Sequence, residues 1–219
     1  DGITRIRLGS LEPRIITEEF VQTLSGLWKV CPHFHLSLQS GCQETLERMN
    51  RRYTADEYRE KCQILRKYYE NPALTTDVIV GFPQESLEEF RESYEFVKEI
   101  QFYETHIFKY SRRKGTKADK MEGQIPEQEK TRRSEQMIAL GQERAFQYEN
   151  SFLGGKLDIL LEEEIQIDGK SYLTGHSREY IKAAVPAEGG WKINDCVCMI
   201  PERFLKDRLL TGTVTKFSL

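Results

Sequence analysis

The stretch Ala73-Leu74-Thr75-Thr76-Asp77-Val78-Ile79-Val80-Gly81-Phe82-Pro83 decides the fold of this chain. Its first eight residues are apolar or β-branched except for Asp77, a composition typical of a strand that is covered on both faces. Gly81 and Pro83 then predict a turn, because these two residues favour sharp changes of chain direction. The stretch therefore predicts a buried parallel strand that ends in a tight loop.

The same succession of strand, loop and helix recurs along the first two thirds of the chain. Helices are predicted to begin at N-capping residues, with Thr17 opening a helix to about Trp28 and capping boxes at Thr54 and Ser86. Four strand-like runs alternate with the helical segments: 3–8, 33–38, 73–80 and 105–110. Four units fit only part of an α/β barrel, since a complete barrel needs about 250 residues.

The last third has a different pattern. Pro126 is expected in the first turn of a long polar helix, and after residue 150 short strands are separated by Gly154-Gly155, Asp168-Gly169 and Gly189-Gly190. We therefore predict an α/β domain over residues 1–150, including a linking helix at 126–150. A small all-β barrel is predicted over residues 153–219.

Composition narrows the possible functions. The chain has 219 residues and a formal net charge of −3, which argues against nucleic-acid binding through overall positive charge. Its five cysteines form no disulfide framework, so a reducing cytoplasm is the expected location. No apolar run approaches the roughly 20 residues of a membrane-spanning helix. The start at Asp1-Gly2 leads us to expect an internal part of a longer protein.

Polar residues follow the predicted strands, at the edge where parallel α/β folds collect functional groups. Gln39 and Ser40 could bind sugar hydroxyls or a carboxylate, although Ser40 is also a suitable cap for the next helix. Gly81 and Pro83 could let the backbone lie against a flat ring, or they could form an ordinary turn. Both interpretations remain open from these residues alone.

Asp77 requires a partner, because an ionised carboxylate inside a strand is costly to bury unpaired. The Asp77 carboxylate could be paired within the protein, by Arg52 or by a nest of backbone N–H groups. Alternatively, it could bind a ligand. The segment 112–120 holds five basic residues and one acid, 5 − 1 = +4, which suits phosphate contact if it is not merely a solvated loop.

Two pairs of residues in the sequence are of types that bind metal ions. His33 and His35 point to one face of a strand, but no third ligand is evident nearby in the sequence. Cys196 and Cys198 also share a strand face, without the second pair that a zinc site needs. We therefore predict no metal ligands in this chain.

Five segments, in order, resemble one known family. They are Arg5-Ile6-Arg7-Leu8-Gly9-Ser10-Leu11-Glu12-Pro13, His35-Leu36-Ser37-Leu38-Gln39-Ser40-Gly41, Arg48-Met49-Asn50-Arg51-Arg52-Tyr53-Thr54, Thr76-Asp77-Val78-Ile79-Val80-Gly81-Phe82-Pro83 and Tyr110-Ser111-x-Arg113-x-Gly115-Thr116-x-Ala118. Together they resemble the radical S-adenosylmethionine (SAM) tRNA methylthiotransferases of the MiaB-like group, over essentially the whole chain.

The resemblance implies the third to sixth strands of a radical SAM partial barrel, followed by a small OB-like RNA-binding barrel called a TRAM domain. It implies that SAM is bound by Gln39, Ser40, Asp77, Gly81, Phe82 and Pro83. It further implies that the tRNA anticodon stem-loop is contacted by Arg112, Arg113, Lys114, Arg178 and Lys182.

Two departures from the family pattern bear on catalysis. Members carry an N-terminal domain with one 4Fe–4S cluster and a Cys-x-x-x-Cys-x-x-Cys loop for a second, and this chain contains neither. The fragment alone is therefore expected to be inactive and to depend on the missing N-terminal part of the same protein. Gln84 also stands where the family usually has Gly, in the loop that approaches adenine.

The segment Leu11-Glu12-Pro13 is similar to enzymes that act on N6-threonylcarbamoyladenosine at tRNA position 37. An enzyme acting on isopentenyladenosine is the alternative within the family. A non-catalytic RNA-binding module is the alternative outside it. A barrel lyase is disfavoured, because Lys109 is the only lysine in the four strand runs and has no evident acid–base partner.

Overall fold

The computed structural model describes residues 2–216, and the chain divides into two compact units between Ala145 and Phe146. The helix α5 crosses this division, so its last turn belongs to the second unit. The elements up to α5 are β1 (Ser10–Leu11), η1 (Pro13–Ile15), α1 (Glu18–Ser25), β2 (His33–Leu36), α2 (Gln43–Arg48), α3 (Ala55–Tyr68), β3 (Ala73–Val80), α4 (Leu87–Ile100), β4 (Glu104–Lys109), η2 (Ala118–Lys120) and α5 (Glu127–Asn150).

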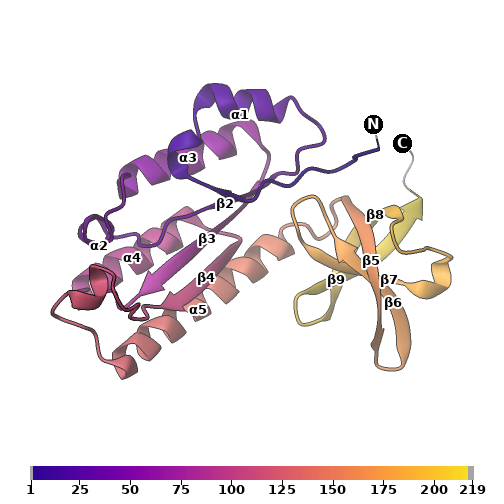
Figure 1. Ribbon diagram of the computed structural model, residues 1–219. Helices are drawn as coiled ribbons and strands as arrows, with labels where there is room; N and C mark the ends of the chain where they lie inside the picture. The colour runs from indigo at the N-terminus through magenta and orange to yellow at the C-terminus, as the bar shows by residue number, and fades with distance from the viewer. Residues whose placement is uncertain (1, 217–219) are drawn as a thin grey trace. The chain divides into compact units, whose positions relative to one another are not determined.

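The first unit is built on a parallel sheet of order β1-β2-β3-β4, which confirms the predicted α/β class. The strands β2, β3 and β4 are labelled in Figure 1. One face carries Phe34, Leu36 and Val78, which are buried in the core formed with α3, α4 and α5. The opposite face, which we call the open face, carries Asp77, His106 and Phe108, and Phe108 is 53% exposed. Within the described residues of the first unit, helices therefore cover only one side of the sheet.

The helices begin where the capping patterns predicted. Thr54 and Glu57 form a complete capping box at α3, and Ser86 forms another at α4. Tyr58 is fully buried and donates from its hydroxyl to the backbone oxygen of Leu36 at 2.9 Å, which joins α3 to β2. Cys62 is a buried core thiol, as predicted, and burial raises its pKa to about 12. The burial of these side chains and the hydrogen bond from Tyr58 thus stabilise the packing of α3 against the sheet.

The predicted strand at 3–8 is wrong. Only Ile6 in this run pairs, through a single bridge to Val30, and the short strand β1 begins at Ser10. Ile3 and Ile6 are 61% and 42% exposed, so little apolar burial stabilises an extended strand there. Strand propensity alone does not form a ladder without a neighbour to pair with.

The predicted end of the first helix is also wrong. Thr17 caps α1 by accepting from the backbone N–H of Phe20, but the helix stops at Ser25 before Gly26. Leu27 and Trp28 are exposed, so they do not extend its buried face. The apolar spacing that suggested a longer helix therefore does not correspond to packing.

A buried ion pair joins the loop after β3 to α5. Glu85 and Arg133 have side chains that are only 1% and 5% exposed, with Oε2 and NH1 2.6 Å apart. The same Glu85 oxygen accepts from the backbone N–H of Gly81 at 2.7 Å, and Glu129 accepts from Arg133 Nε at 2.8 Å. Burial raises the pKa of Glu85, and the hydrogen bond from Arg133 opposes that rise. Loop and helix are held as one piece.

The second unit contains a closed five-stranded barrel of order β5-β6-β7-β9-β8. Asp168 and Gly169 both have positive φ and form the tight β5–β6 turn. Gly175 lets β6 lie close to β5, because a Cβ atom there would overlap the backbone of Leu160. The barrel strands are β5 (Leu157–Ile167), β6 (Lys170–His176), β7 (Lys182–Pro186), β8 (Cys196–Lys206) and β9 (Leu209–Lys216), with η3 (Ala187–Gly189) after β7. This confirms the predicted β-barrel.

Among the residues that the structure describes, no helix has the length and apolar character needed to cross a membrane.

Stability should fall with acid because of His33. Burial lowers the pKa of His33 from 6.5 to about 4, so the folded chain binds fewer protons than the unfolded chain between those values. The His33 contribution is fully present above about pH 6.5 and is lost as the pH falls to about 4, by about 3 kcal/mol. Urea unfolding at about pH 6.5 and pH 4 measures this loss. The free energy of unfolding should fall less between these two pH values in His33→Phe than in the unchanged protein. An equal loss in both proteins would contradict this.

Arg133→Met should lower the free energy of unfolding by about 3–5 kcal/mol, because it leaves the Glu85 carboxylate buried without its charged partner. Adding Glu85→Gln should recover part of the loss. The matched control is Arg132→Met, since Arg132 also pairs with Glu129 but is 47% exposed, and it should cost less than about 1 kcal/mol. Equal losses for Met at positions 132 and 133 would refute the role of the buried pair.

Candidate functional site

A cavity of about 680 Å³ opens where the strands of the parallel sheet end. Its walls come from the loops after β2, β3 and β4 and from the end of the open face, which is the edge at which the sequence predicted a site. The lining residues are Gln39, Arg51, Asp77, Ile79, Phe82, Phe108, Lys109, Tyr110, Ser111, Arg113, Thr116 and Ala118.

Gln39 is placed in the cavity by an unusual backbone. Its φ is 72°, and its N–H and C=O pair with Asp77 and Ile79 of β3, each at 2.8 Å. The hydrogen bonds offset the strain of a left-handed conformation at a residue with a side chain. They attach the loop after β2 to the middle of the sheet, and the Gln39 amide lines the cavity.

Asp77 lies on the open face with its side chain 30% exposed. The expected partner Arg52 is not the one found. Instead, Asp77 Oδ2 lies 3.4 Å from Nε2 of His35 on the neighbouring strand. The reason is the register of the sheet, which aligns Thr75 with His35 and places the Asp77 side chain one step further along the same face.

The loop 81–85 is rigid for reasons visible in its contacts. Gly81 has φ 71° and its added Cβ would overlap the side chain of Lys130, so glycine is required there. Phe82 is 7% exposed and packs edge-on against Tyr110, with ring centroids 5.2 Å apart. Gln84 keeps a positive φ of 68° where the family has glycine, and its N–H donates to Gly123 at 2.8 Å. The departure leaves a left-handed turn.

Ser40 and Pro83 do not line the cavity. Ser40 is 1% exposed, and its hydroxyl accepts from the backbone N–H of Cys42 at 3.2 Å. Pro83, which follows Phe82 in the same loop, is also buried. The remaining SAM-side residues, Gln39, Asp77 and Phe82, do meet in the cavity, with Gly81 directly before Phe82.

Arg51 was not assigned from the sequence, yet it lines the cavity. Its Nε is buried and has no hydrogen-bond partner within residues 2–216. A buried guanidinium nitrogen without a partner is costly, and a ligand carboxylate would satisfy it. The sequence alone does not show which of the two neighbouring arginines, Arg51 or Arg52, lines the cavity. In the folded chain Asn50, with φ 58°, forms a turn just before them. The residues therefore fit an amino-acid cofactor such as SAM.

The residues predicted to contact RNA lie in both units. Arg112 is already paired with Asp119, whose carboxylate accepts from Nε at 3.0 Å, which reduces the available charge of the loop. Arg113 lines the cavity, and Lys114 is exposed beside it. In the second unit, Lys182 pairs with Glu163 at 2.9 Å.

Arg178, the other residue predicted for the barrel, lies in the sequence between the two members of a stacked aromatic pair. The rings of His176 and Tyr180 lie 4.2 Å apart between centroids and are 12° from parallel. Charge and an aromatic surface thus occur together at this end of β6.

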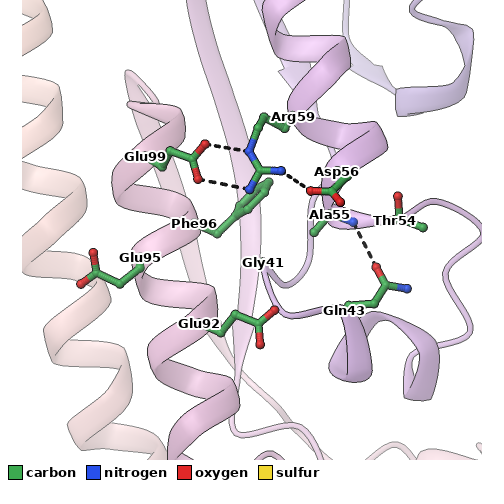
Figure 2. Close-up of a pocket in the computed structure, with 10 residues that line it drawn as sticks. All are labelled: Gly41, Gln43, Thr54, Ala55, Asp56, Arg59, Glu92, Glu95, Phe96 and Glu99. Carbon is green, nitrogen blue, oxygen red and sulfur yellow. Dashed lines mark hydrogen bonds and ion pairs between the residues drawn. The ribbon is translucent and has the colours of Figure 1, made fainter.

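A second cavity, of about 710 Å³, lies on the helical side of the first unit (Figure 2). Arg59 extends between Glu99 and Asp56, and Glu92 and Glu95 leave the lining strongly acidic. This charge would repel phosphate and carboxylate ligands. The cavity at the strand ends is therefore the better candidate for binding SAM or RNA.

The cysteines do not fit an iron–sulfur cluster. Cys31, Cys42 and Cys62 are buried in the first unit, while Cys196 and Cys198 lie on β8. Burial raises the pKa of Cys42 to about 12, which disfavours the thiolate that ligates iron. Within the described residues, no three cysteines form a common set of metal donors.

Three comparisons with known proteins agree with the family resemblance found in the sequence. Residues 2–97 match the model of the radical SAM superfamily. The chain is 38% identical over 183 residues to the threonylcarbamoyladenosine tRNA methylthiotransferase MtaB of Bacillus subtilis, covering 83% of this chain and 41% of that protein. It is 35% identical over 180 residues to the tRNA-2-methylthio-N(6)-dimethylallyladenosine synthase of Finegoldia magna, covering 82% and 39%.

A solved structure shares the fold. Coproporphyrinogen III oxidase (HemN) from Escherichia coli aligns with a TM-score of 0.54 at 18% identity, over 64% of this chain and 32% of that chain. The chain spans about two fifths of the length of the two curated relatives. Residues 2–97 thus resemble a radical SAM domain, and about four fifths of the chain is similar to curated tRNA methylthiotransferases.

Proposed function

We propose that this chain is part of a radical SAM enzyme that adds a 2-methylthio group to N6-threonylcarbamoyladenosine at position 37 of tRNA. The cavity at the strand ends carries this proposal. Gln39, Asp77 and Phe82 meet there with Arg51, whose Nε has no hydrogen-bond partner among residues 2–216. The similarity to MtaB supports the reaction class. A cytoplasmic location accords with a tRNA substrate.

SAM, when bound beside its 4Fe–4S cluster, supplies the radical and methyl chemistry. The residues of this chain would hold SAM. Asp77 would accept hydrogen bonds from the ribose hydroxyls, and the Gln39 amide would donate to or accept from them. Phe82, fixed by Tyr110, offers an apolar surface to the adenine ring. Arg51 would hold the carboxylate of the cofactor through its guanidinium group. Gly81 and Pro83 shape the loop, and Ser40 holds the loop after β2 in place.

The charge of the cavity favours threonylcarbamoyladenosine over isopentenyladenosine. Arg51 and Arg113 both line it, whereas SAM brings only one carboxylate. The threonyl group of the proposed substrate brings a second carboxylate for the exposed Arg113 to bind, whereas an isopentenyl group brings no anion. Isopentenyladenosine remains the alternative substrate, because the relative from Finegoldia magna is nearly as similar.

The chain supplies the cofactor wall and the RNA contacts, and the cluster ligands come from an N-terminal part of the same protein. We propose that this part carries two 4Fe–4S clusters, since the cysteines described above cannot hold one. The anticodon stem-loop contacts Arg112, Arg113 and Lys114 in the first unit, and Arg178 and Lys182 on the barrel. A module that only binds RNA would not need the cavity.

Deletion of the gene that encodes this chain should remove 2-methylthio-N6-threonylcarbamoyladenosine from cellular tRNA and leave its isopentenyl counterpart unchanged. Mass spectrometry of nucleosides from digested tRNA measures both. Complementation with the intact gene should restore the lost nucleoside, and Arg113→Met should restore it poorly because the second carboxylate loses its partner. Loss of the isopentenyl product instead would establish the alternative substrate, and loss of neither would refute the proposed reaction.

We predict the salt dependence of tRNA binding in a variant with Ala in place of Arg112, Arg113 and Lys114. Each lost phosphate contact lowers the magnitude of the slope of log K against log salt concentration by about 0.9. Arg112 is already paired with Asp119, so the slope should fall by about 2 units rather than 3. Unmodified tRNA should weaken only through the lost phosphate contacts, which do not read the base. Modified tRNA should weaken further, because Arg113 is also proposed to bind the threonyl carboxylate. Titration of the intact protein at several salt concentrations measures the slope. Asp119→Asn, which frees Arg112, should raise the slope by about 1, and unchanged slopes would exclude the loop from the RNA interface.

A further inference from the structure

We infer that His35, Asp77 and His106 form a binding site for a divalent first-row transition-metal ion such as Zn²⁺ on the open face of the sheet. These residues come from three adjacent strands, β2, β3 and β4. One donor atom from each lies within 4.8 Å of the other two. The inference does not depend on the proposed function, because it concerns side chains that the sheet itself brings together.

The sheet register explains why the three side chains meet. Asp77 is aligned with His106 on β4, and parallel neighbours in register point to the same face. His35 is aligned with Thr75, two residues before Asp77, so it shares that face as well. The two histidine rings stack with centroids 5.9 Å apart. Three donors on paired strands are held with little freedom to separate.

The hydrogen bonds of His35 direct its free nitrogen toward the other donors. Thr75 Oγ1 lies 3.0 Å from Nδ1, so Nε2 is the atom left to face Asp77. Nε2 and Asp77 Oδ2 are 3.4 Å apart, longer than the usual 2.7–3.2 Å of an N–H···O hydrogen bond. A metal ion between them would replace a weak contact with two strong ones. Metal-binding histidines are commonly oriented by a hydrogen bond from the second ring nitrogen to an oxygen acceptor, and the hydroxyl of Thr75 takes that position here.

The donor set selects the class of ion. Two imidazoles and one carboxylate suit Zn²⁺, Co²⁺, Ni²⁺ or Fe²⁺, whereas Mg²⁺ and Ca²⁺ prefer oxygen ligands throughout. The side chains of His35 and Asp77 are 15% and 30% exposed, and His106 is exposed, so the ion can enter from the open face. Three protein ligands leave at least one position for water.

The second group of donors offers a weaker site. Cys42, Glu44 and Glu92 also have atoms within 4.8 Å of one another. Burial raises the pKa of Cys42 to about 12, and a protonated thiol is a poor ligand. The histidine site is therefore the one to test. It shares Asp77 with the proposed SAM pocket, so an ion and the cofactor would use the same carboxylate.

Titration of this chain with Co²⁺, followed by its visible absorption, tests the site without cofactor or RNA. We expect saturable d–d absorption that Zn²⁺ displaces. His106→Asn, at an exposed position, and Asp77→Asn, of the same shape, should each weaken binding by more than about 100-fold, and Thr75→Val by about 10–100-fold through loss of the orienting hydroxyl. His176→Asn is the matched control, since it removes a histidine paired with Glu162 in the other unit, and should leave binding unchanged.

Two results would overturn the inference. One is absorption that persists at full strength in both His106→Asn and Asp77→Asn. The other is a thiolate charge-transfer band that disappears in Cys198→Ser, which would place the ion on the half-exposed cysteines of β8. Absence of any saturable absorption also counts against the site.

Discussion

The buried pair of Glu85 and Arg133 is the interaction on which the candidate site depends most. It joins the loop after β3 to the helix α5, and the same carboxylate holds the backbone N–H of Gly81. Phe82 follows directly and forms one wall of the cavity. A buried ion pair contributes little net stability compared with apolar packing. It does strongly disfavour other loop conformations, because each of them would leave one buried charge without its partner. Its value here is that it specifies one loop position.

The rest of the site follows from a sheet covered on one side. Tyr58, Phe34 and Val78 bury the helical face, which leaves the other face free to carry polar groups. Asp77 can therefore stand inside a strand without full desolvation, with His35 beside it.

Local sequence signals predicted the elements whose ends are chemically marked. Capping boxes at Thr54 and Ser86 and the turn at Asp168-Gly169 act within a few residues, and the structure agrees with each. Signals without local chemistry were less reliable. The apolar run at 3–8 looked like a strand, but a strand exists only if a neighbour pairs with it, and pairing is a property of the whole sheet.

The sequence by itself determined the alternation of strand and helix, the change to a β-barrel, and the family, because these depend on periodicity, capping and ordered motifs. Only the tertiary structure decided which side chains meet. His106 lies 71 positions beyond His35 in the sequence, yet strand register brings both beside Asp77. Arg51 and Arg52 are chemically identical, and the turn at Asn50 decides which of them lines the cavity. Distances across a sheet come from long-range pairing, which no local pattern of residues encodes.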